Sequence, residues 1–351
     1  MTSTKPTQNL RRTNDLDFFS QIIMQQRQRS YANAILEATD QAMSISDDVI
    51  VLGQLSDLPS GMFGTTSGLV EKYGRNRVHD FPVAENLMTA VALGASLTGY
   101  RPLIVHHRLD FMMYSIDVIV NWLSLWYFKS NGKSNAPVTI RAIVGKGWGQ
   151  GPQHSKSLHA WFSHLPGLRV AVPATAFDAK GLLLESLLSD TPTIIIEGRN
   201  LFSMTDHVPE EPYRIPFGRA IIRRPGVDLT LVAIGTMVPL ALRAAEMSQL
   251  DGINVEVIDP RTLAPIDLEI ICSSVSKTGR LVVADPAWRS YGAAAEIVSA
   301  VAEMVGNKFK SNPVRVTLPD SHTPMSMALE SRFYPTEHDI QNAITVSFDA
   351  S

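Results

Sequence analysis

Short apolar segments alternate with longer amphipathic ones along most of this chain. Val49-Ile-Val-Leu-Gly53 carries apolar side chains at consecutive positions, which is typical of a parallel strand buried on both faces. Residues 31–43 instead repeat their apolar positions at helical spacing. The expected strands are 49–53, 77–81, 101–107, 138–144, 168–173, 193–197, 229–234, 254–258, 280–284 and 314–318. Alternating strands and helices predict an α/β fold with mostly parallel sheets covered by helices on both faces, including one aromatic-rich helix over 110–127.

A charged, proline-containing segment separates two such alternating units. Residues 206–216 contain three prolines among charged side chains, which is typical of a linker. A length of 351 residues also fits two domains better than one. We therefore predict an N-terminal extension over 1–28, a first three-layer domain over 29–205, a linker over 206–216 and a second three-layer domain over 217–351.

Composition excludes several classes of function. A net charge of −3 gives no electrostatic reason to bind nucleic acid or an anionic membrane. The single cysteine, Cys272, excludes an intrachain disulfide and a zinc site built on paired thiolates. No apolar run approaches the roughly 18 residues of a membrane span, and the first thirty residues lack the apolar core of a secretory signal. We expect a reducing compartment, the cytoplasm.

Glu85 is the first candidate for chemistry. It follows Asp80-Phe-Pro-Val-Ala84 at the expected turn from strand to helix, and a run of small residues comes after it. A carboxyl group at such a turn is poorly solvated, so it can hold or share a proton. A satisfied acidic helix cap is the alternative.

A glycine-rich loop, residues 145–151, leads from a strand to a second candidate, His154. The loop lacks the Lys-Ser/Thr ending of a P-loop and the spacing of a dinucleotide fingerprint. Its glycines instead predict that a backbone or a ligand approaches closely. His154 follows at the carboxyl end of the expected sheet, where ligands bind in such folds, although a structural histidine is also common there.

His106, His107 and Arg108 end another expected strand, and Phe111 follows them. The basic cluster is either a solvated rim or a site for an anionic substrate. The aromatic run that begins at Phe111 is typical of an interface or a core.

Taken together, these segments resemble the β subunit of the thiamine-diphosphate-dependent first component of 2-oxoacid dehydrogenase complexes, in the transketolase-like group. The likeness runs from about Tyr31 to Ile344. The segments that carry it are Pro82-Val-Ala-Glu85, Gly151-Pro-Gln-His154-Ser155, Ala160-Trp161, Pro166-Gly-Leu-Arg-Val170, Ala179-Lys-Gly-Leu182 and Asp259-Pro-Arg-Thr-Leu-Ala-Pro-Ile-Asp267. The resemblance implies a pyrimidine-binding domain followed by a transketolase C-terminal domain.

The resemblance also implies roles for individual residues. Glu85 matches the glutamate that hydrogen-bonds N1′ of the cofactor's aminopyrimidine and activates it, and Phe111 matches the aromatic residue that stacks on that ring. His154 matches a histidine that handles protons and assists acyl transfer. Gln54 occupies a cofactor-binding position at which the family usually has a glutamate, and it cannot ionise.

Two further departures concern Ala90, where glycine is common in the family, and residues 106–108, which replace a mostly apolar and hydroxyl stretch. They leave cofactor activation plausible and put the usual substrate and acyl acceptor in question.

No Gly-Asp-Gly…Asn signature for diphosphate and metal occurs in the sequence. The resemblance therefore implies an α-type subunit that supplies the diphosphate-binding domain and holds magnesium, in an α2β2 assembly whose C-terminal domains contribute the contact between β chains. No metal ligand is assigned to this chain itself, although residues 189–191 lie where relatives bind a structural potassium. The substrate would be a small 2-oxoacid.

Three functions remain open from the sequence. The first is decarboxylation of a 2-oxoacid with transfer of the acyl group, in which Glu85 and His154 are catalytic. The second is the C-terminal half of a split transketolase-like enzyme that moves a ketol or acyl unit to a sugar-like acceptor, for which the basic residues 106–108 suit a phosphorylated substrate. The third is a noncatalytic partner that kept the fold.

Overall fold

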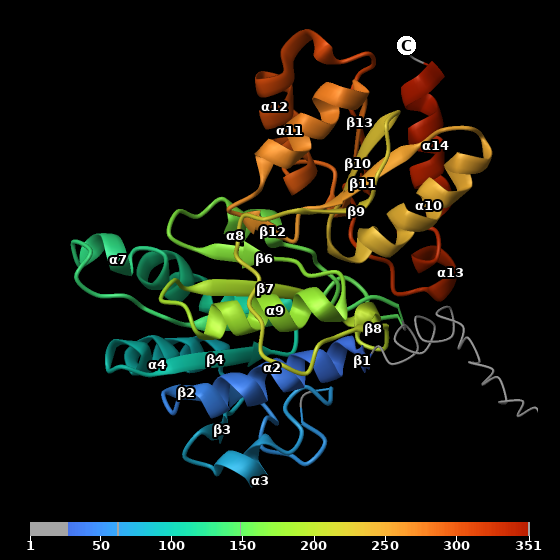
Figure 1. The fold of residues 1–351 in the computed structure, drawn as a ribbon. Coiled ribbons are helices and arrows are strands. Elements are labelled where there is room, and N and C mark those ends of the chain that lie inside the picture. The colour runs from blue at the N-terminus through green and yellow to red at the C-terminus, as the bar shows by residue number, and fades with distance from the viewer. Residues whose placement is uncertain (1–26, 62, 148, 350–351) are drawn as a thin grey trace, which may run out of the picture.

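Two α/β units, one from each half of the chain, stack one above the other (Figure 1). The computed structural model describes residues 27–61, 63–147 and 149–349. Each unit has a mostly parallel sheet between two layers of helices, so the predicted fold class is confirmed. Among the described residues, no helix is both long enough and apolar enough to cross a membrane.

The first sheet has seven strands in the order β12-β6-β7-β5-β4-β2-β3. Its six parallel strands are β2 (Val49–Gly53), β3 (Val78–Asp80), β4 (Arg101–His106), β5 (Thr139–Val144), β6 (Arg169–Ala171) and β7 (Thr193–Gly198). Helices α2 (Tyr31–Ile45) and α9 (Ala176–Leu187) cover one face, with α3 (Leu69–Tyr73) beside them. Helices α4 (Glu85–Leu97), α5 (Leu109–Met112) and α8 (His159–Ser163) cover the other face.

The second sheet has five strands in the order β14-β13-β10-β11-β9. The parallel strands are β10 (Leu229–Ala233), β11 (Val255–Asp259), β13 (Leu281–Trp288) and β14 (Val314–Leu318), and β9 (Ile221–Arg224) is an antiparallel edge. Helices α10 (Val238–Leu250) and α14 (Glu337–Asp349) cover one face, and α11 (Leu268–Thr278) and α12 (Ala293–Val305) cover the other. Between β14 and α14 lies the short helix α13 (Met327–Glu330).

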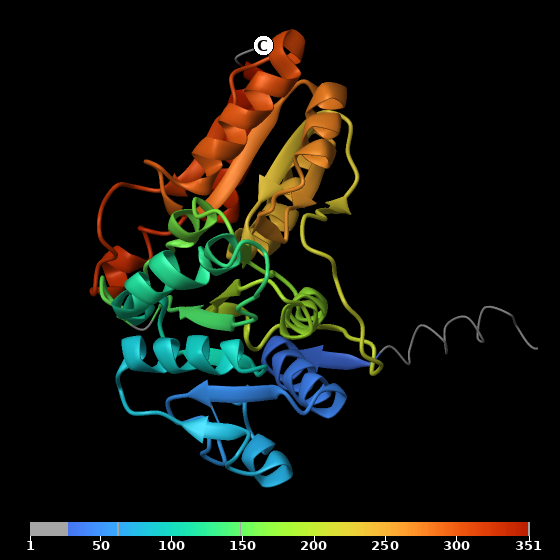
Figure 2. The ribbon, with the colours of Figure 1, turned by 90° about the vertical axis from the view of Figure 1, so that its left-hand side faces the viewer.

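The segment that joins the two units runs along the outside of the molecule (Figure 2). Its first residues form β8 (Thr205–His207), which pairs in antiparallel fashion with β1 (Gln28–Ser30). This small sheet was not predicted, because three-residue strands with polar sequences carry no hydrophobic signal. It ties the start of the connection to the start of the described chain.

The prediction of a single helix over 110–127 is wrong. The structure instead has α5, the 3₁₀ turn η1 (Met113–Ser115), α6 (Ile116–Val118), the π-helical turn η2 (Ile119–Leu123) and α7 (Trp126–Lys129). Several residues here are β-branched, and such side chains crowd the preceding helical turn. The backbone is also constrained from outside, because a Cβ atom on Gly167 would lie 2.1 Å from the carbonyl oxygen of Ser124.

The two units share more than the connecting segment. Strand β12 (Thr262–Ala264) belongs to the second half of the chain but pairs with β6 of the first sheet. His159 of α8 and Asp285 of β13 form a buried pair with Nε2 and Oδ1 2.9 Å apart. The Asp285 carboxyl also accepts N–H bonds from Ala287 and Ala294, and its pKa is lowered below the usual range by His159 and by these bonds, against the opposing effect of burial.

A buried ion cluster forms a second bridge between the units. Asp178, at the start of α9, pairs with Arg223 of β9 and with Arg261, whose Nε lies 2.8 Å from Oδ1 of Asp178. Arg223 also bonds Asp259 at the end of β11, at 2.8 Å. Both aspartate side chains are fully buried, so each depends on the two arginines for compensation.

We predict that Asp178→Asn lowers the free energy of unfolding by about 3 kcal/mol, because it leaves Arg223 and Arg261 short of a buried counter-charge. Urea unfolding followed by circular dichroism measures the loss. The matched control is Asp190→Asn, which removes an exposed pair with Arg101 and should cost less than about 1 kcal/mol. Equal losses in the two variants would contradict a structural role for the cluster.

Candidate active site

The candidate residues gather at one edge of the first sheet. In the sheet order β7-β5-β4-β2-β3, each of these parallel strands ends at the same edge, where open α/β sheets bind ligands. The residues that follow the strand ends are Arg199 after β7, the loop 145–154 after β5, His107 and Arg108 after β4, Gln54 after β2 and Glu85 after β3. Positions spread over more than a hundred residues of sequence are therefore brought to the same sheet edge.

Glu85 is the first residue of α4 and is only 9% exposed. Its N-cap residue, Ala84, has no side chain that could cap the helix, so the first-turn N–H groups favour negative charge nearby. Gln54 donates from Nε2 to Oε1 of Glu85 at 3.3 Å. The carboxyl group thus has a neutral amide, rather than a cation, as its side-chain partner in the part of the chain that the structure describes.

Phe111 and His154 lie together beside this edge. Their ring centroids are 5.3 Å apart and the planes are nearly perpendicular, at 86°. Phe111 is 36% exposed, so its ring remains accessible to a stacking ligand. Nδ1 of His154 lies 3.1 Å from the carbonyl oxygen of Gln150. Because a carbonyl can only accept, Nδ1 carries the proton, and Nε2 of the neutral ring keeps a lone pair for proton transfer.

The basic cluster predicted at residues 106–108 is divided by the structure. The His106 side chain is 2% exposed, and neither ring nitrogen has a hydrogen-bond partner among the described residues. Burial, together with the neighbouring His107, lowers the pKa of His106 to about 3. His106 is therefore neutral at ordinary pH and contributes no charge to a substrate site.

His107 turns toward the edge instead. Its Nε2 lies 3.0 Å from the carbonyl oxygen of Gln54, so Nε2 donates a proton to that oxygen. Burial lowers the pKa of His107, which the bond to Gln54 partly opposes. His107 thereby links the strand end of β4 to the residue that holds Glu85.

Arg108 places a cation beside this arrangement. It donates from Nη2 to Oε1 of Gln150 at 3.0 Å, and its guanidinium lies 5.6 Å from the ring centroid of Phe63. Its Nε is buried and has no hydrogen-bond partner in the described segments. The guanidinium of Arg199 lies 4.6 Å from the same ring centroid. Two guanidinium groups around one aromatic ring make this the positive side of the site.

Two of these residues were missed by the sequence analysis. Arg199 follows Gly198, the last residue of the buried strand β7, so the rule that ligands bind beyond strand ends would have identified it. Phe63 lies in a long loop between β2 and α3, and nothing in its sequence surroundings indicates that it returns to the sheet.

The turn at residues 189–191 binds a side chain of this chain. Arg101 donates to the carbonyl oxygen of Ser189 at 2.7 Å and to Oδ1 of Asp190 at 2.6 Å. A cation at this turn would have to compete with the guanidinium. Across the described residues, no group of three or more His, Cys, Asp or Glu side chains is arranged to hold a metal ion.

Comparison with known proteins identifies both halves of the chain. The transketolase pyrimidine-binding domain model matches residues 27–204, and the transketolase C-terminal domain model matches residues 218–340. The acetoin:2,6-dichlorophenolindophenol oxidoreductase subunit beta of Cupriavidus necator is 38% identical over 327 residues, covering 90% of this chain and 96% of the relative. The pyruvate dehydrogenase E1 component subunit beta of Bacillus subtilis is 34% identical over 314 residues, covering 89% and 96%.

A solved structure is also similar. It is described as a split gene transketolase, inactive beta4 tetramer, and it superposes with a TM-score of 0.72 at 26% identity. The match covers 92% of this chain and 98% of that one.

We predict that His106 makes the protein less stable in mild acid. The unfolded state binds a proton near the ordinary histidine pKa of about 6.5, whereas the folded state does not until the pKa of about 3, so stability falls as the pH drops below 6.5. Between pH 7.5 and pH 5 this group alone should cost about 2 kcal/mol.

Urea unfolding of the wild type and of His106→Leu at the two pH values measures this cost. The loss between pH 7.5 and pH 5 should be smaller in the variant by about 2 kcal/mol. His338→Leu, which removes an exposed histidine, should keep the wild-type loss. If His106→Leu loses as much unfolding free energy between pH 7.5 and pH 5 as the wild type does, His106 is not buried in the neutral form.

Proposed function

The chain belongs to the transketolase-like family that includes the β subunits of pyruvate dehydrogenase and acetoin oxidoreductase, and from this membership we propose that it is the β subunit of a thiamine-diphosphate-dependent enzyme. The reaction is decarboxylation of a 2-oxoacid and transfer of the resulting acyl group. The observation that carries the proposal is the nearly buried Glu85 carboxyl group, held by a neutral amide, at the same sheet edge as an accessible Phe111 ring and the His154 imidazole.

The residues at this edge fit the aminopyrimidine part of the cofactor. Glu85 has one oxygen bonded to Gln54 at 3.3 Å, which leaves the carboxyl group with further capacity to bond a ring nitrogen. Phe111 offers an exposed ring for stacking. When bound, thiamine diphosphate supplies the nucleophilic carbon that adds to the keto group of the substrate.

Glu85 is proposed to share a proton with the pyrimidine nitrogen. Its burial excludes water that would otherwise compete for that proton. Gln54 orients the carboxyl group without adding charge, whereas a cation in its place would hold Glu85 as a fixed anion. Proton sharing is therefore compatible with the glutamine that this chain has after β2.

His154 is proposed to move protons at the substrate. The Gln150 carbonyl fixes the tautomer, so Nε2 can accept a proton in one step and return it in another. The perpendicular contact with Phe111 limits the rotation of the imidazole ring. His154 and the stacking residue are thus positioned as one unit.

Arg108 and His107 are proposed to receive the carboxylate of the 2-oxoacid. Arg108 has a buried Nε–H with no partner among the described residues, and an anionic oxygen would satisfy it. His106 is left out of this site because it is buried and neutral.

An α-type subunit is proposed to complete the site in an α2β2 assembly, with the C-terminal domains contributing to the contact between β chains. It would bind the diphosphate and magnesium, because no cluster in the described part of this chain is arranged to hold a metal ion. A structural potassium at residues 189–191 receives the least support, since Arg101 already binds that turn. A cytoplasmic location is part of the same proposal.

The two alternatives receive less support. The relatives at 34–38% identity are named as dehydrogenase or oxidoreductase subunits, which favours the 2-oxoacid reaction over ketol transfer to a sugar. The basic cluster that suited a phosphorylated sugar is also smaller once His106 is removed from it. A noncatalytic role does not explain why Glu85, Phe111 and His154 meet at one sheet edge.

We predict that thiamine diphosphate binds only to the pair of chains. Isothermal calorimetry with magnesium should give no binding for this chain alone, because nothing in its sequence carries the diphosphate signature. Co-expression with the α-type subunit should give saturable binding. Turnover of the pair is then tested with pyruvate, a branched-chain 2-oxoacid, acetoin and a ketose phosphate, and turnover of the ketose phosphate alone would favour the transketolase-like alternative.

We predict that Glu85→Gln lowers kcat of the complete assembly by about 100-fold or more while the assembly stays folded, because the amide cannot share a proton. Steady-state kinetics and size-exclusion chromatography measure both effects. Glu71→Gln, an exposed change of the same chemistry in α3, is the control and should leave kcat unchanged. Wild-type kcat in Glu85→Gln would favour the noncatalytic role.

A further inference from the structure

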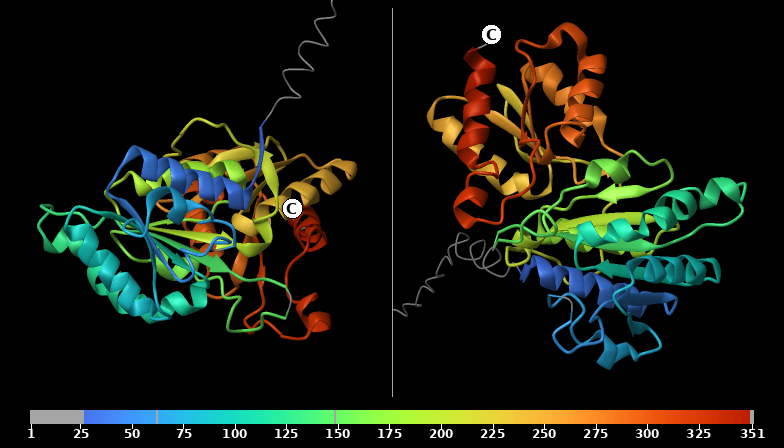
Figure 3. Two further views of the ribbon diagram at one scale, coloured as in Figure 1. Left: turned by 90° about the horizontal axis from the view of Figure 1, so that it is seen from below. Right: turned by 180° about the vertical axis from the view of Figure 1, so that it is seen from behind.

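A segment of the second domain lies across the glycine-rich loop of the first domain. We call residues 325–334 the strap; they include α13 and follow the carboxyl end of β14. Figures 1 and 3 show α13 below the second sheet, next to the first domain. A Cβ atom on Gly149 would lie 3.0 Å from the carbonyl oxygen of Met325, and one on Gly151 would lie 2.5 Å from its Cγ. Of the backbone or ligand predicted to approach this loop, the structure shows the strap backbone at Gly149, and at Gly151 the side chain of Met325 approaches.

Glu330, in α13, makes the polar contact between strap and loop. Its Oε1 accepts the N–H of Gly147 at 2.9 Å, and its Oε2 accepts the N–H of Gly149 at 3.3 Å. The residue is 5% exposed, so water cannot replace these bonds easily. A single carboxylate from the second domain thus holds two peptide groups of the first.

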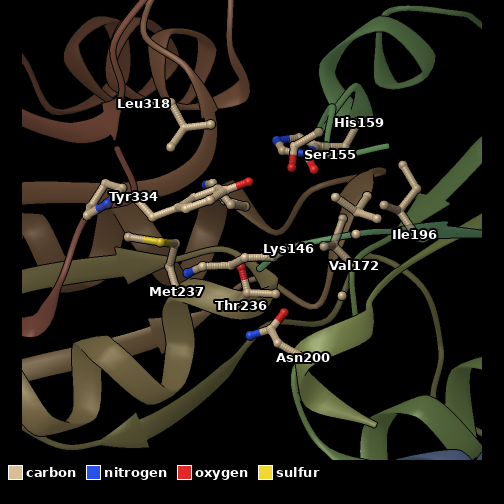
Figure 4. Close-up of a pocket in the computed structure, with 16 residues that line it drawn as sticks. Lys146, Ser155, His159, Val172, Ile196, Asn200, Thr236, Met237, Leu318 and Tyr334 are labelled. Atoms are coloured by element: carbon tan, nitrogen blue, oxygen red, sulfur yellow. The ribbon is translucent and has the colours of Figure 1, made fainter. Parts of the chain in front are cut away.

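Lys146, in the loop, carries a positive charge that complements the negative charge of Glu330 in the strap. Its Nζ lies 4.4 Å from the ring centroid of Tyr334, at the other end of the strap. Burial lowers the pKa of Lys146, and the negative charge of Glu330 opposes that effect. Figure 4 shows Lys146 and Tyr334 on the wall of a small cavity of about 30 Å³ between the two domains, with Ser155 and Thr236 nearby. The loop and the strap are therefore complementary in shape and in charge.

The loop that Glu330 holds determines where the His154 ring lies. Gln150 follows Gly149 directly, and its carbonyl oxygen accepts the proton of Nδ1 of His154 at 3.1 Å. The loop closes on itself through the N–H of Gly145, which donates to the carbonyl oxygen of His154 at 2.9 Å. A displaced loop would move both the ring and the acceptor that fixes its tautomer.

We propose that Glu330 is a positioning residue for His154, acting from the second domain through the backbone of the glycine-rich loop. This inference rests on the proposed role of His154 in proton transfer. A loop with glycines at 145, 147, 149 and 151 has little conformational preference of its own, so an external anchor determines its geometry. Two charge-assisted hydrogen bonds from one carboxylate to the loop backbone form such an anchor. A displacement of about 1 Å at a catalytic group can lower the rate about 100-fold.

The first test is Glu330→Gln in the complete assembly with its α-type subunit. Glutamine keeps the size of the side chain, but it has one acceptor oxygen where the carboxylate has two, so one glycine N–H loses its partner. We expect kcat to fall about 10- to 100-fold. The Kd for thiamine diphosphate should stay within about twofold, because Glu330 contacts neither Glu85 nor Phe111. KM is expected to change less than kcat, although Gln150 of the same loop bonds Arg108.

Glu337→Gln is the matched control. Glu337 lies in the same domain, at the start of α14, and pairs with Arg243 at 3.4 Å. The change removes the same charge away from the loop, so kcat should stay at the wild-type value. Equal falls in kcat for the two variants would overturn the proposal, since they would indicate a general effect on the second domain.

Hydrogen–deuterium exchange supplies a second readout that does not depend on turnover. In the wild-type assembly, peptides over 145–151 should contain protected amides, and Glu330→Gln should raise their exchange rate at least tenfold. Wild-type exchange as fast as in unbonded loops, or wild-type kcat in Glu330→Gln, would overturn the proposal. If Glu330→Gln fails to assemble, the wild-type exchange decides the matter.

The same measurements separate this inference from the proposed function. A wild-type assembly without cofactor binding or turnover would overturn the function, whatever the exchange rates are. An active wild type with an unprotected loop would overturn only the role of Glu330.

Discussion

The convergence of parallel strands at one sheet edge is the constraint on which the site depends. Strands β2, β4, β5 and β7 are buried for most of their length, so a polar side chain that is to meet a ligand has to lie beyond a carboxyl end. The strands are hydrogen-bonded neighbours, and these ends therefore place Gln54, Glu85, His107 and His154 within one region. The site is a consequence of sheet topology before it is a consequence of any single residue.

Two buried carboxyl groups near this edge of the sheet, Glu197 and Glu85, have different kinds of side-chain partner. On neighbouring strands β5 and β7, Arg141 and Glu197 form a fully buried pair with two bonds of 2.6 and 2.8 Å, which fixes both side chains. Arg141 also bonds the Thr65 hydroxyl at 3.1 Å, which fixes the loop that carries Phe63 next to Arg108. Glu85 has no such cation and bonds an amide instead. A neutral partner leaves a carboxyl group able to share a proton, whereas a bonded cation favours its charged form.

The sequence was sufficient for features that depend on local pattern. The buried run at residues 49–53 and the turn at Glu85 could be recognised because strand periodicity and a helix start are encoded by neighbouring residues. The helix expected over 110–127 is interrupted several times, and the interruption at Ser124 lies where Gly167, more than forty residues away in the chain, comes close to the Ser124 carbonyl oxygen. The burial of His106 could not be predicted either, because β4 is buried continuously up to its last residue and the sequence does not show which of the two adjacent histidines is that residue.

Glu330 shows most clearly which features local sequence cannot predict. Nothing near it in sequence indicates a function, and its partners, Gly147 and Gly149, are more than 180 residues away. The glycines did indicate that something approaches the loop, but not that the approaching group comes from the other domain. Two separate bridges, the Asp178 cluster and the pair of His159 with Asp285, set the relative position of the domains. Because these bridges hold the two domains together, the strap can hold the loop in a defined geometry, and Glu330 of the second domain acts on the site through the backbone of that loop.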